Sequence, residues 1–81
     1  MKKSITLRYF AQLAEKSGLD HEVLSGDQTT AQDWYQSQKQ KYRFTLTVEE
    51  VRPAINGKYV SWNTELQDGD TLVFIPPVSG G

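Results

Sequence analysis

Apolar and polar residues alternate at the start of the chain. Ile5, Leu7 and Tyr9 occupy every second position, and the residues between them are polar. Because successive side chains of a strand point to opposite faces, this alternation predicts a strand over residues 4–10 with one buried face. Phe10 is the exception, since it places an aromatic ring on the polar face.

A helical spacing follows this strand. Phe10, Leu13 and Ala14 stand at i, i+3 and i+4, which is the spacing of one helix face. Gly18 is a natural residue to end a helix, because glycine adopts the left-handed conformation without strain. The sequence therefore predicts a short helix that ends there. Residues 19–24 are ambiguous between a loop and the start of a second strand.

A second helix is predicted from its capping residues. Thr29 and Thr30 offer side-chain oxygens for the N-cap, and Gln32 or Asp33 stands where a capping box places its partner. We expect the helix to run from about residue 30 to 41. Its apolar face is thin and consists of Ala31, Trp34 and Tyr35.

Two further strands are predicted in the second half of the chain. Apolar residues occupy every second position from Phe44 to Val48, which predicts a strand over residues 43–48. Residues 51–55 predict another strand. Pro53 lies within it and donates no backbone hydrogen bond, so we expect this strand to be a sheet edge or to bend there.

Turn residues separate these segments. Ser-Gly-Asp at 25–27 is typical of a turn, and Asn-Gly at 56–57 is the strongest hairpin signal in the chain. Asp-Gly-Asp at 68–70 predicts a tight turn before an apolar strand at 71–75. Pro-Pro at 76–77 ends strand pairing, because neither residue has a backbone N–H.

The order of these elements predicts an α+β fold. A β-grasp roll is the natural candidate, with a mixed sheet of about four to five strands and helices on one face. We expect one β-grasp domain over residues 1–75 and an extended C-terminal tail over residues 76–81 that ends in Gly-Gly.

The last strand is apolar on both faces. Leu72 and Phe74 share one face, and Val73 and Ile75 share the other. A sheet covered by a single layer needs only one apolar face, so we expect Leu72 and Phe74 in the core and the other pair on an exposed patch that binds a partner. Alternatively, a second layer covers these side chains, or they are scattered over the surface. The predicted interface comprises Phe10, Tyr59, Val73, Ile75, Pro76 and Pro77.

Composition narrows the chemistry open to the chain. Its 81 residues carry a formal net charge of -1, which gives no electrostatic reason to expect a nucleic-acid partner. There is no cysteine and one histidine, so neither a nucleophile–base pair nor a metal-ligand set can be assembled. We therefore expect no isolated enzyme and no bound cofactor or metal. No apolar run approaches the roughly 20 residues of a membrane span, so we expect no membrane and a cytoplasmic location.

The tail is the most informative segment for function. Its two prolines start a stiff, extended exit, and the six residues reach at most about 20 Å. Val78, Ser79, Gly80 and Gly81 include no bulky side chain. We predict that residues 78–80 thread a partner's active site and that the Gly81 carboxyl is the reacting group. The alternative is a frayed end without a role.

The chemistry predicted for Gly81 needs no cysteine. A carboxylate is a poor electrophile, but reaction with a nucleoside triphosphate converts it to an acyl-adenylate. Transfer of sulfur to the same carbon then gives a thiocarboxylate, which is nucleophilic at neutral pH. These steps need a reachable and unhindered terminus, which two glycines supply.

Three segments resemble one known family. Residues 68–81, with Asp-Gly-Asp, an apolar strand and Pro-Pro-Val-Ser-Gly-Gly, resemble the end of the small subunit of molybdopterin synthase, a family of ubiquitin-like sulfur carriers. Residues 9–15 resemble the family's first strand and helix, and residues 55–57 resemble its hairpin.

The resemblance implies a β-grasp fold and a thiocarboxylate on Gly81. It implies three partners: an activating enzyme that adenylates Gly81 with ATP, a sulfur donor, and a large catalytic subunit that holds the pterin precursor in a heterotetramer. Two sulfurs, one from each carrier, form the dithiolene that binds molybdenum. The chain would be the non-catalytic sulfur-donor subunit, without metal or pterin ligands of its own.

Other functions remain open from the residues alone. A terminal Gly-Gly also suits a sulfur carrier for thiamine thiazole synthesis or tRNA thiolation, although Pro-Pro-Val before it favours the molybdopterin branch. A ubiquitin-like modifier or adaptor, or a plain binding domain with an inert tail, are further alternatives.

Overall fold

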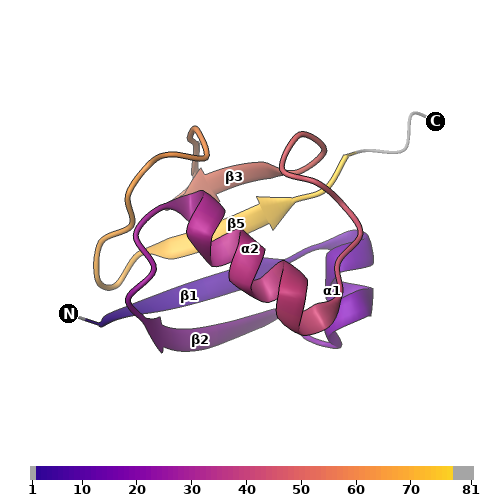
Figure 1. The fold of residues 1–81 in the computed structure, drawn as a ribbon, viewed down its shortest axis with the longest axis horizontal. Helices are drawn as coiled ribbons and strands as arrows, with labels where there is room; N and C mark the ends of the chain where they lie inside the picture. Colours follow the sequence, from indigo (N-terminus) through magenta and orange to yellow (C-terminus); the bar gives the residue numbers. More distant parts are fainter. Residues whose placement is uncertain (1, 78–81) are drawn as a thin grey trace.

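The computed structural model describes residues 2–77 as a mixed sheet covered on one face by helices (Figure 1). The sheet has five strands in the order β2-β1-β5-β3-β4. In chain order the elements are β1 (Lys3–Tyr9), α1 (Ala11–Ser17), β2 (His21–Gly26), α2 (Ala31–Tyr42), β3 (Arg52–Ile55), β4 (Lys58–Tyr59) and β5 (Thr71–Ile75).

The first and last strands lie side by side at the centre of the sheet. β1 pairs with β5 in parallel and with β2 antiparallel, and β3 pairs antiparallel with both β5 and β4. A parallel pair needs a long crossover, and here everything between β1 and β5 forms that crossover. The predicted α+β, β-grasp roll is confirmed.

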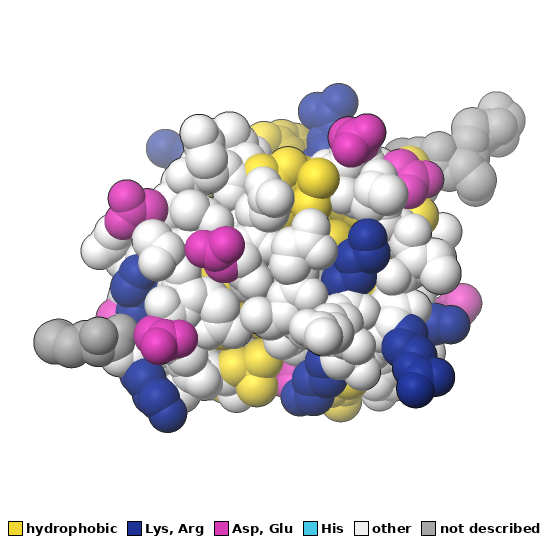
Figure 2. Space-filling model, viewed as in Figure 1, with side chains coloured by type: hydrophobic (Ala, Val, Ile, Leu, Met, Phe, Trp, Pro, Cys, Tyr) yellow, Lys and Arg dark blue, Asp and Glu magenta, His cyan; other side chains and the backbone are white. Residues whose placement is uncertain are grey.

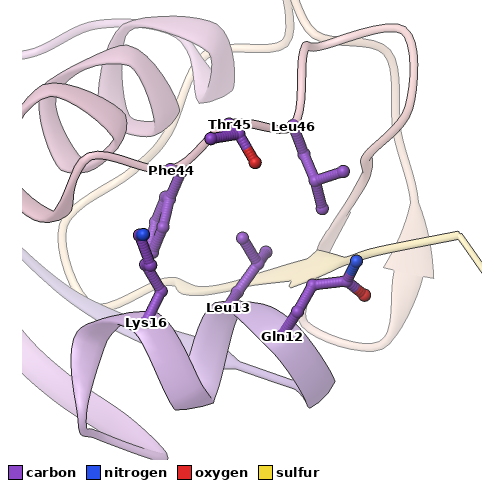
Figure 3. Close-up of a pocket in the computed structure, with 6 residues that line it drawn as sticks. All are labelled: Gln12, Leu13, Lys16, Phe44, Thr45 and Leu46. Atoms are coloured by element: carbon purple, nitrogen blue, oxygen red, sulfur yellow. The ribbon is translucent and has the colours of Figure 1, made fainter.

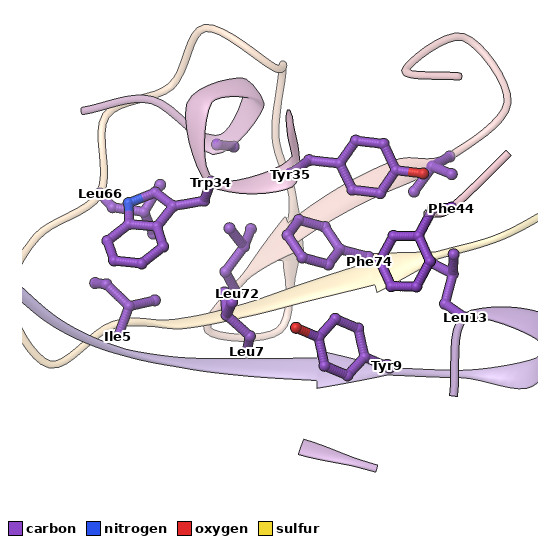
Figure 4. Close-up of a cluster of buried hydrophobic side chains, with 12 residues drawn as sticks. Ile5, Leu7, Tyr9, Leu13, Trp34, Tyr35, Phe44, Leu66, Leu72 and Phe74 are labelled. Atoms are coloured by element: carbon purple, nitrogen blue, oxygen red, sulfur yellow. The ribbon is translucent and has the colours of Figure 1, made fainter. Parts of the chain in front are cut away.

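The core lies between the sheet and α2. Ile5, Leu7 and Tyr9 of β1 and Leu72 and Phe74 of β5 are at most 2% exposed, as the alternation predicted (Figure 4). Burying one such side chain contributes roughly 1.5–3 kcal/mol relative to leaving it in water. The helices and loops complete this core with Leu13, Trp34, Tyr35, Phe44, Val51 and Leu66.

α1 ends and α2 begins at the capping residues that the sequence predicted. Gly18 caps α1 in the left-handed conformation, with φ of 77°, and its N–H bonds to the carbonyl of Ala14. Thr30 caps α2, and its side chain and that of Asp33 form a reciprocal capping box. These local hydrogen bonds explain why α2 begins at Ala31 although its apolar face is thin.

Two predictions from local pattern are wrong. Ser25 and Gly26 continue β2 instead of forming a turn, because β1 reaches back far enough to pair with both. Residues 43–48 are not a strand. Phe44 is buried there, but the backbone bonds to side chains: the Tyr35 hydroxyl donates to the Leu46 carbonyl at 2.7 Å. The alternation therefore reflects burial against the core and not membership of the sheet.

The hairpin prediction is confirmed, while Pro53 needs a correction. Asn56 and Gly57 both have positive φ, of 51° and 89°, as a tight hairpin between β3 and β4 requires. β3 is not an edge strand, because β4 flanks it. However, β4 pairs only with Ala54 and Ile55, so Pro53 lies beyond its end and its missing N–H removes no bond to β4.

None of the helices within residues 2–77 has the length and apolar character needed to cross a membrane.

Candidate functional site

The tail leaves the sheet at the end of β5. Ile75 is the last paired residue, as the Pro-Pro stop predicted. Pro76 is buried against the domain and Pro77 is exposed. Gly81, the predicted reacting residue, lies outside the described residues, as do the residues predicted to thread a partner's active site, Val78, Ser79 and Gly80.

The sheet face opposite the helices carries one continuous row of side chains next to this exit. Arg8 stands beside Val73, and Val73 stands beside Ala54. Ala54 in turn stands beside Tyr59, whose side chain is 67% exposed. The row alternates with core positions along each strand, so it lies on the face that no helix covers.

Phe10 and Ile75 extend this face toward the tail. Ile75 pairs with Arg52, and the pairing of Tyr9 with Phe74 brings Phe10 level with Ile75. Phe10 is the N-cap residue of α1, and its side chain is 46% exposed. Of the predicted interface residues, Phe10, Tyr59, Val73 and Ile75 therefore lie on one face, and their binding role stays a prediction.

A groove opens beside the tail exit. It measures about 520 Å³ and is open to solvent. Its lining comprises Glu49, Glu50, Arg52, Tyr59, Ile75, Pro76 and Pro77. The three charged residues were missed at the sequence level. Arg52 stands two residues before Ala54 along β3 and therefore shares its face, so a correct register for β3 would have placed Arg52 there.

A second, smaller pocket lies between α1 and the segment that follows α2. Figure 3 shows Leu13 and Lys16 of α1 facing Phe44 and Leu46 across it. Its volume is about 130 Å³. Among the described residues that line it, Lys16 is the one that carries a charge, and none supplies a carboxylate or an imidazole. This pocket offers space without a set of groups that could bind a charged ligand or perform chemistry.

Glu22 organises a polar cluster on the helix side of the sheet. Its carboxylate accepts from the hydroxyls of Tyr9 at 2.6 Å and Tyr42 at 2.7 Å, and from the Gln38 amide at 3.2 Å. Burial and then the hydrogen bond to Glu22 raise the pKa of Tyr42 to about 12. Burial, followed by the same carboxylate, also raises the pKa of Tyr9. The cluster joins α2 to β1 and β2 and thus has a structural role.

The aspartates before β5 have turn roles as well. Asp68 accepts from the N–H of Ser4 at 2.6 Å, and Asp70 accepts from the N–H of Gln67 at 2.8 Å. Their carboxylates therefore hold the turn and do not form an acid–base pair. No three histidine, aspartate or glutamate side chains within residues 2–77 gather as a metal site would require.

Acidic and basic side chains both occur on the helix-covered face. Figure 2 shows them among polar atoms, with several basic side chains toward the lower right, where α2 ends. The last turn of α2 carries Lys39 and Lys41, which suit the negative end of the helix dipole.

Comparison with known proteins gives matches that extend over nearly the whole chain. The ThiS family pattern matches residues 7–81. The sulfur carrier subunit of molybdopterin synthase from Escherichia coli (strain K12) is 32% identical over 80 residues, which cover 95% of this chain and 99% of that protein.

Solved structures agree in the same way. A putative molybdopterin converting factor, subunit 1, from Pyrococcus furiosus is 29% identical with a TM-score of 0.76, and the match covers 94% of this chain and 99% of that one. Small archaeal modifier protein 1 from Methanosarcina acetivorans is 25% identical with a TM-score of 0.79, over 100% of this chain and 99% of that one. The chain has the ubiquitin-like β-grasp fold and belongs to the ThiS family, as its resemblance to the molybdopterin synthase small subunit implied.

Proposed function

We propose that this chain is the sulfur carrier subunit of a molybdopterin synthase and that the Gly81 carboxyl carries the sulfur. The observation that supports this most directly is the match, over nearly all of both chains, to a protein that bears this function. The Pro-Pro-Val-Ser-Gly-Gly end of the sequence supplies the narrow terminus that the chemistry needs.

The proposed reaction proceeds in two steps on Gly81. An activating enzyme joins the carboxylate to the AMP part of ATP and releases pyrophosphate. A sulfide-level sulfur from the donor then attacks the acyl carbon and displaces AMP, which leaves the thiocarboxylate. In the large subunit this sulfur passes to the pterin precursor. The described residues of this chain act as a folded handle for these steps, and ATP is bound by the activating enzyme.

The experiment on Gly81 is intact mass spectrometry after incubation with the activating enzyme, ATP and a sulfur source. We expect a mass gain equal to the difference between sulfur and oxygen, located at Gly81 by fragmentation. Removal of Gly81 should abolish the gain while the circular dichroism spectrum stays unchanged. A chain with a bulky residue added after Gly81 that still delivers sulfur would contradict the proposal.

The exposed face beside the tail is proposed to bind the large subunit. Phe10, Tyr59, Val73 and Ile75 provide an apolar contact surface on the uncovered side of the sheet. Phe10→Lys together with Ile75→Lys should weaken complex formation at least tenfold, since each places a charge of the same sign in a desolvated contact.

The matched control for this variant is Val23→Lys. Val23 is 62% exposed on β2, at the opposite edge of the sheet from β3 and β4. We expect wild-type affinity for the control, and calorimetry with the purified large subunit measures both. Equal affinity of the double variant and the control would remove this face from the proposal.

A ubiquitin-like modifier is the second candidate. It is supported by the full-length similarity to small archaeal modifier protein 1. A modifier forms amide bonds between its terminus and lysines of other proteins. Incubation with a cell extract and ATP would then yield amide-linked conjugates, whereas a dedicated sulfur carrier would yield only the thiocarboxylate.

A further inference from the structure

We infer that the groove at the tail exit receives a basic side chain of the partner, held by Glu49 and Glu50 at its rim. This inference rests on the proposed function, because it concerns the surface that binds the large subunit. It adds the chemistry of the contact: an apolar floor and an acidic wall, which together fit an arginine or lysine whose stem packs while its charge is paired.

The floor of the groove is continuous with the apolar face described above. Ile75 is half-buried, Tyr59 is exposed, and Pro76 and Pro77 form the start of the tail. The tail therefore starts at this groove, and we expect a partner that takes up the tail to lie over it. Its contact with the groove would extend the contact with Phe10 and Val73 across the same side of the sheet.

The acidic wall stands on a well-anchored turn. Glu50 accepts from the Thr47 N–H at 2.9 Å and from its hydroxyl at 3.2 Å. The N–H groups of Glu50 and Val51 donate to the Thr47 carbonyl at 3.0 and 3.2 Å, and Val51 is only 2% exposed. These bonds fix the backbone that carries both carboxylates, so less conformational entropy is lost when a partner binds.

Charge on this face is asymmetric. Across the sheet from the groove, the Arg8 guanidinium lies 5.8 Å from the centre of the Phe10 ring. On the groove side two glutamates outnumber one arginine, Arg52. A partner therefore meets a cation at one end of the apolar surface and a net negative wall at the other. Such an arrangement fixes orientation and increases the association rate more than it increases affinity.

The reaction itself calls for a basic partner. The end of the tail is an anion as a carboxylate and as a thiocarboxylate, so the pocket that receives it must present positive charge. Four residues after Pro77 reach at most about 14 Å, which keeps that pocket close to the groove. Glu49 and Glu50, beside the start of the tail, carry the same negative charge as the terminal carboxylate. Both would therefore attract the same basic surface of the partner.

Charge reversal at Glu49 tests the inference. Glu49 is exposed, so Glu49→Lys should leave the melting curve unchanged. We expect association with the cognate large subunit to slow roughly 3- to 10-fold at low salt, with the difference shrinking at high salt. Glu49→Gln should give a smaller effect in the same direction. Stopped-flow or surface plasmon resonance measures the rates.

The control variant is Asp27→Lys, which makes the same change in net charge. Asp27 is exposed and follows β2, at the other end of the molecule from the tail exit (Figure 1). If Glu49→Lys and Asp27→Lys slow association equally, the effect is one of net charge and the inference is overturned.

Three further outcomes also decide the matter. A wild-type chain that binds no large subunit and gains no sulfur overturns the proposed function, and this inference with it. A wild-type chain that binds while Glu49→Lys associates at the same rate overturns the inference alone. A concentration-dependent dimer that Glu49→Lys dissociates, seen by sedimentation, would assign the groove to a second copy and overturn the basic-partner assignment.

Discussion

Glu22 explains why the sequence pattern left β2 ambiguous. It points to the core side of β2, where alternation alone would call for an apolar residue. Three donors from Tyr9, Gln38 and Tyr42 satisfy its carboxylate there. A partly buried carboxylate is tolerated only when it is hydrogen-bonded, and these donors come from elements distant in the chain.

At the residue scale, this cluster predicts instability in alkali. The pKa of Tyr42 rises from 10.0 to about 12 on folding, so above pH 10 the unfolded chain binds fewer protons than the folded one. The contribution is complete below pH 10 and is lost as pH rises through about 12. Urea unfolding from neutral pH to about 11 should therefore show a falling free energy of unfolding.

Two variants isolate this effect. Tyr42→Phe removes the titrating hydroxyl, and Glu22→Gln removes the negative charge that helps to raise the pKa of Tyr42. Both should be less stable than wild type at neutral pH, and both should lose less stability between neutral pH and alkali. A variant with the same pH slope as wild type would show that Tyr42 does not contribute.

At the element scale, α2 combines a short buried face with capped ends. Its buried side chains are Ala31, Trp34, Tyr35 and Gln38, and much of the rest is polar. The reciprocal bonds of Thr30 and Asp33 satisfy backbone N–H groups that the first turn leaves without partners. Lysines in the last turn suit the negative end of the helix dipole.

The capping box at the start of α2 predicts the effect of removing the Thr30 side chain. Thr30→Ala should lower the free energy of unfolding by about 1 kcal/mol, since the Asp33 N–H loses its acceptor. Thr45→Ala, at an exposed site outside any helix, serves as the control and should stay within about 0.5 kcal/mol of wild type. Urea titration followed by circular dichroism measures both. Equal stability of the two variants would argue against the capping box.

The element scale also shows where local pattern fails. Phe44, Leu46 and Val48 have the spacing of a strand, and all three pack against the core. The Trp62 indole N–H donates to the Val48 carbonyl at 2.6 Å, so a side chain supplies the bond that a neighbouring strand would otherwise supply. The alternation of apolar residues shows which side chains are buried. It does not show whether the backbone pairs with a neighbouring strand.

At the scale of the whole molecule, the first and last strands lie side by side in the middle of the sheet. β1 and β5 pair over four positions, from Thr6 with Thr71 to Tyr9 with Phe74. The domain is therefore closed by its last strand, and the tail emerges from its most central element. The proposed delivery of the tail into another protein would therefore start from a strand that is paired on both sides.

Truncated chains test whether the fold depends on the tail or on β5. A chain that ends at Pro77 retains every described element and should differ from wild type by less than about 0.5 kcal/mol in the free energy of unfolding. A chain that ends at Asp70 lacks β5, including the fully buried Leu72 and Phe74, and should show no cooperative thermal transition. A cooperative transition in the shorter chain would contradict the central role of β5.

The sequence by itself determined the features that depend on neighbours close in the chain. The alternation of β1 and β5, the caps at Gly18 and Thr30 and the Asn-Gly hairpin all rest on local geometry. The Gly-Gly end is equally readable, because the function proposed for it uses the backbone carboxyl and needs no particular side chain. Family and fold followed from these signals together.

Only the tertiary structure decided the rest. β2 exists because β1 pairs with it and α2 supplies donors to Glu22, and residues 43–48 stay out of the sheet because side chains bind their carbonyls. The groove joins Glu49 to Ile75 across strand pairing that no local pattern contains. These features depend on contacts between segments far apart in the chain, whose energies a single window of sequence cannot represent.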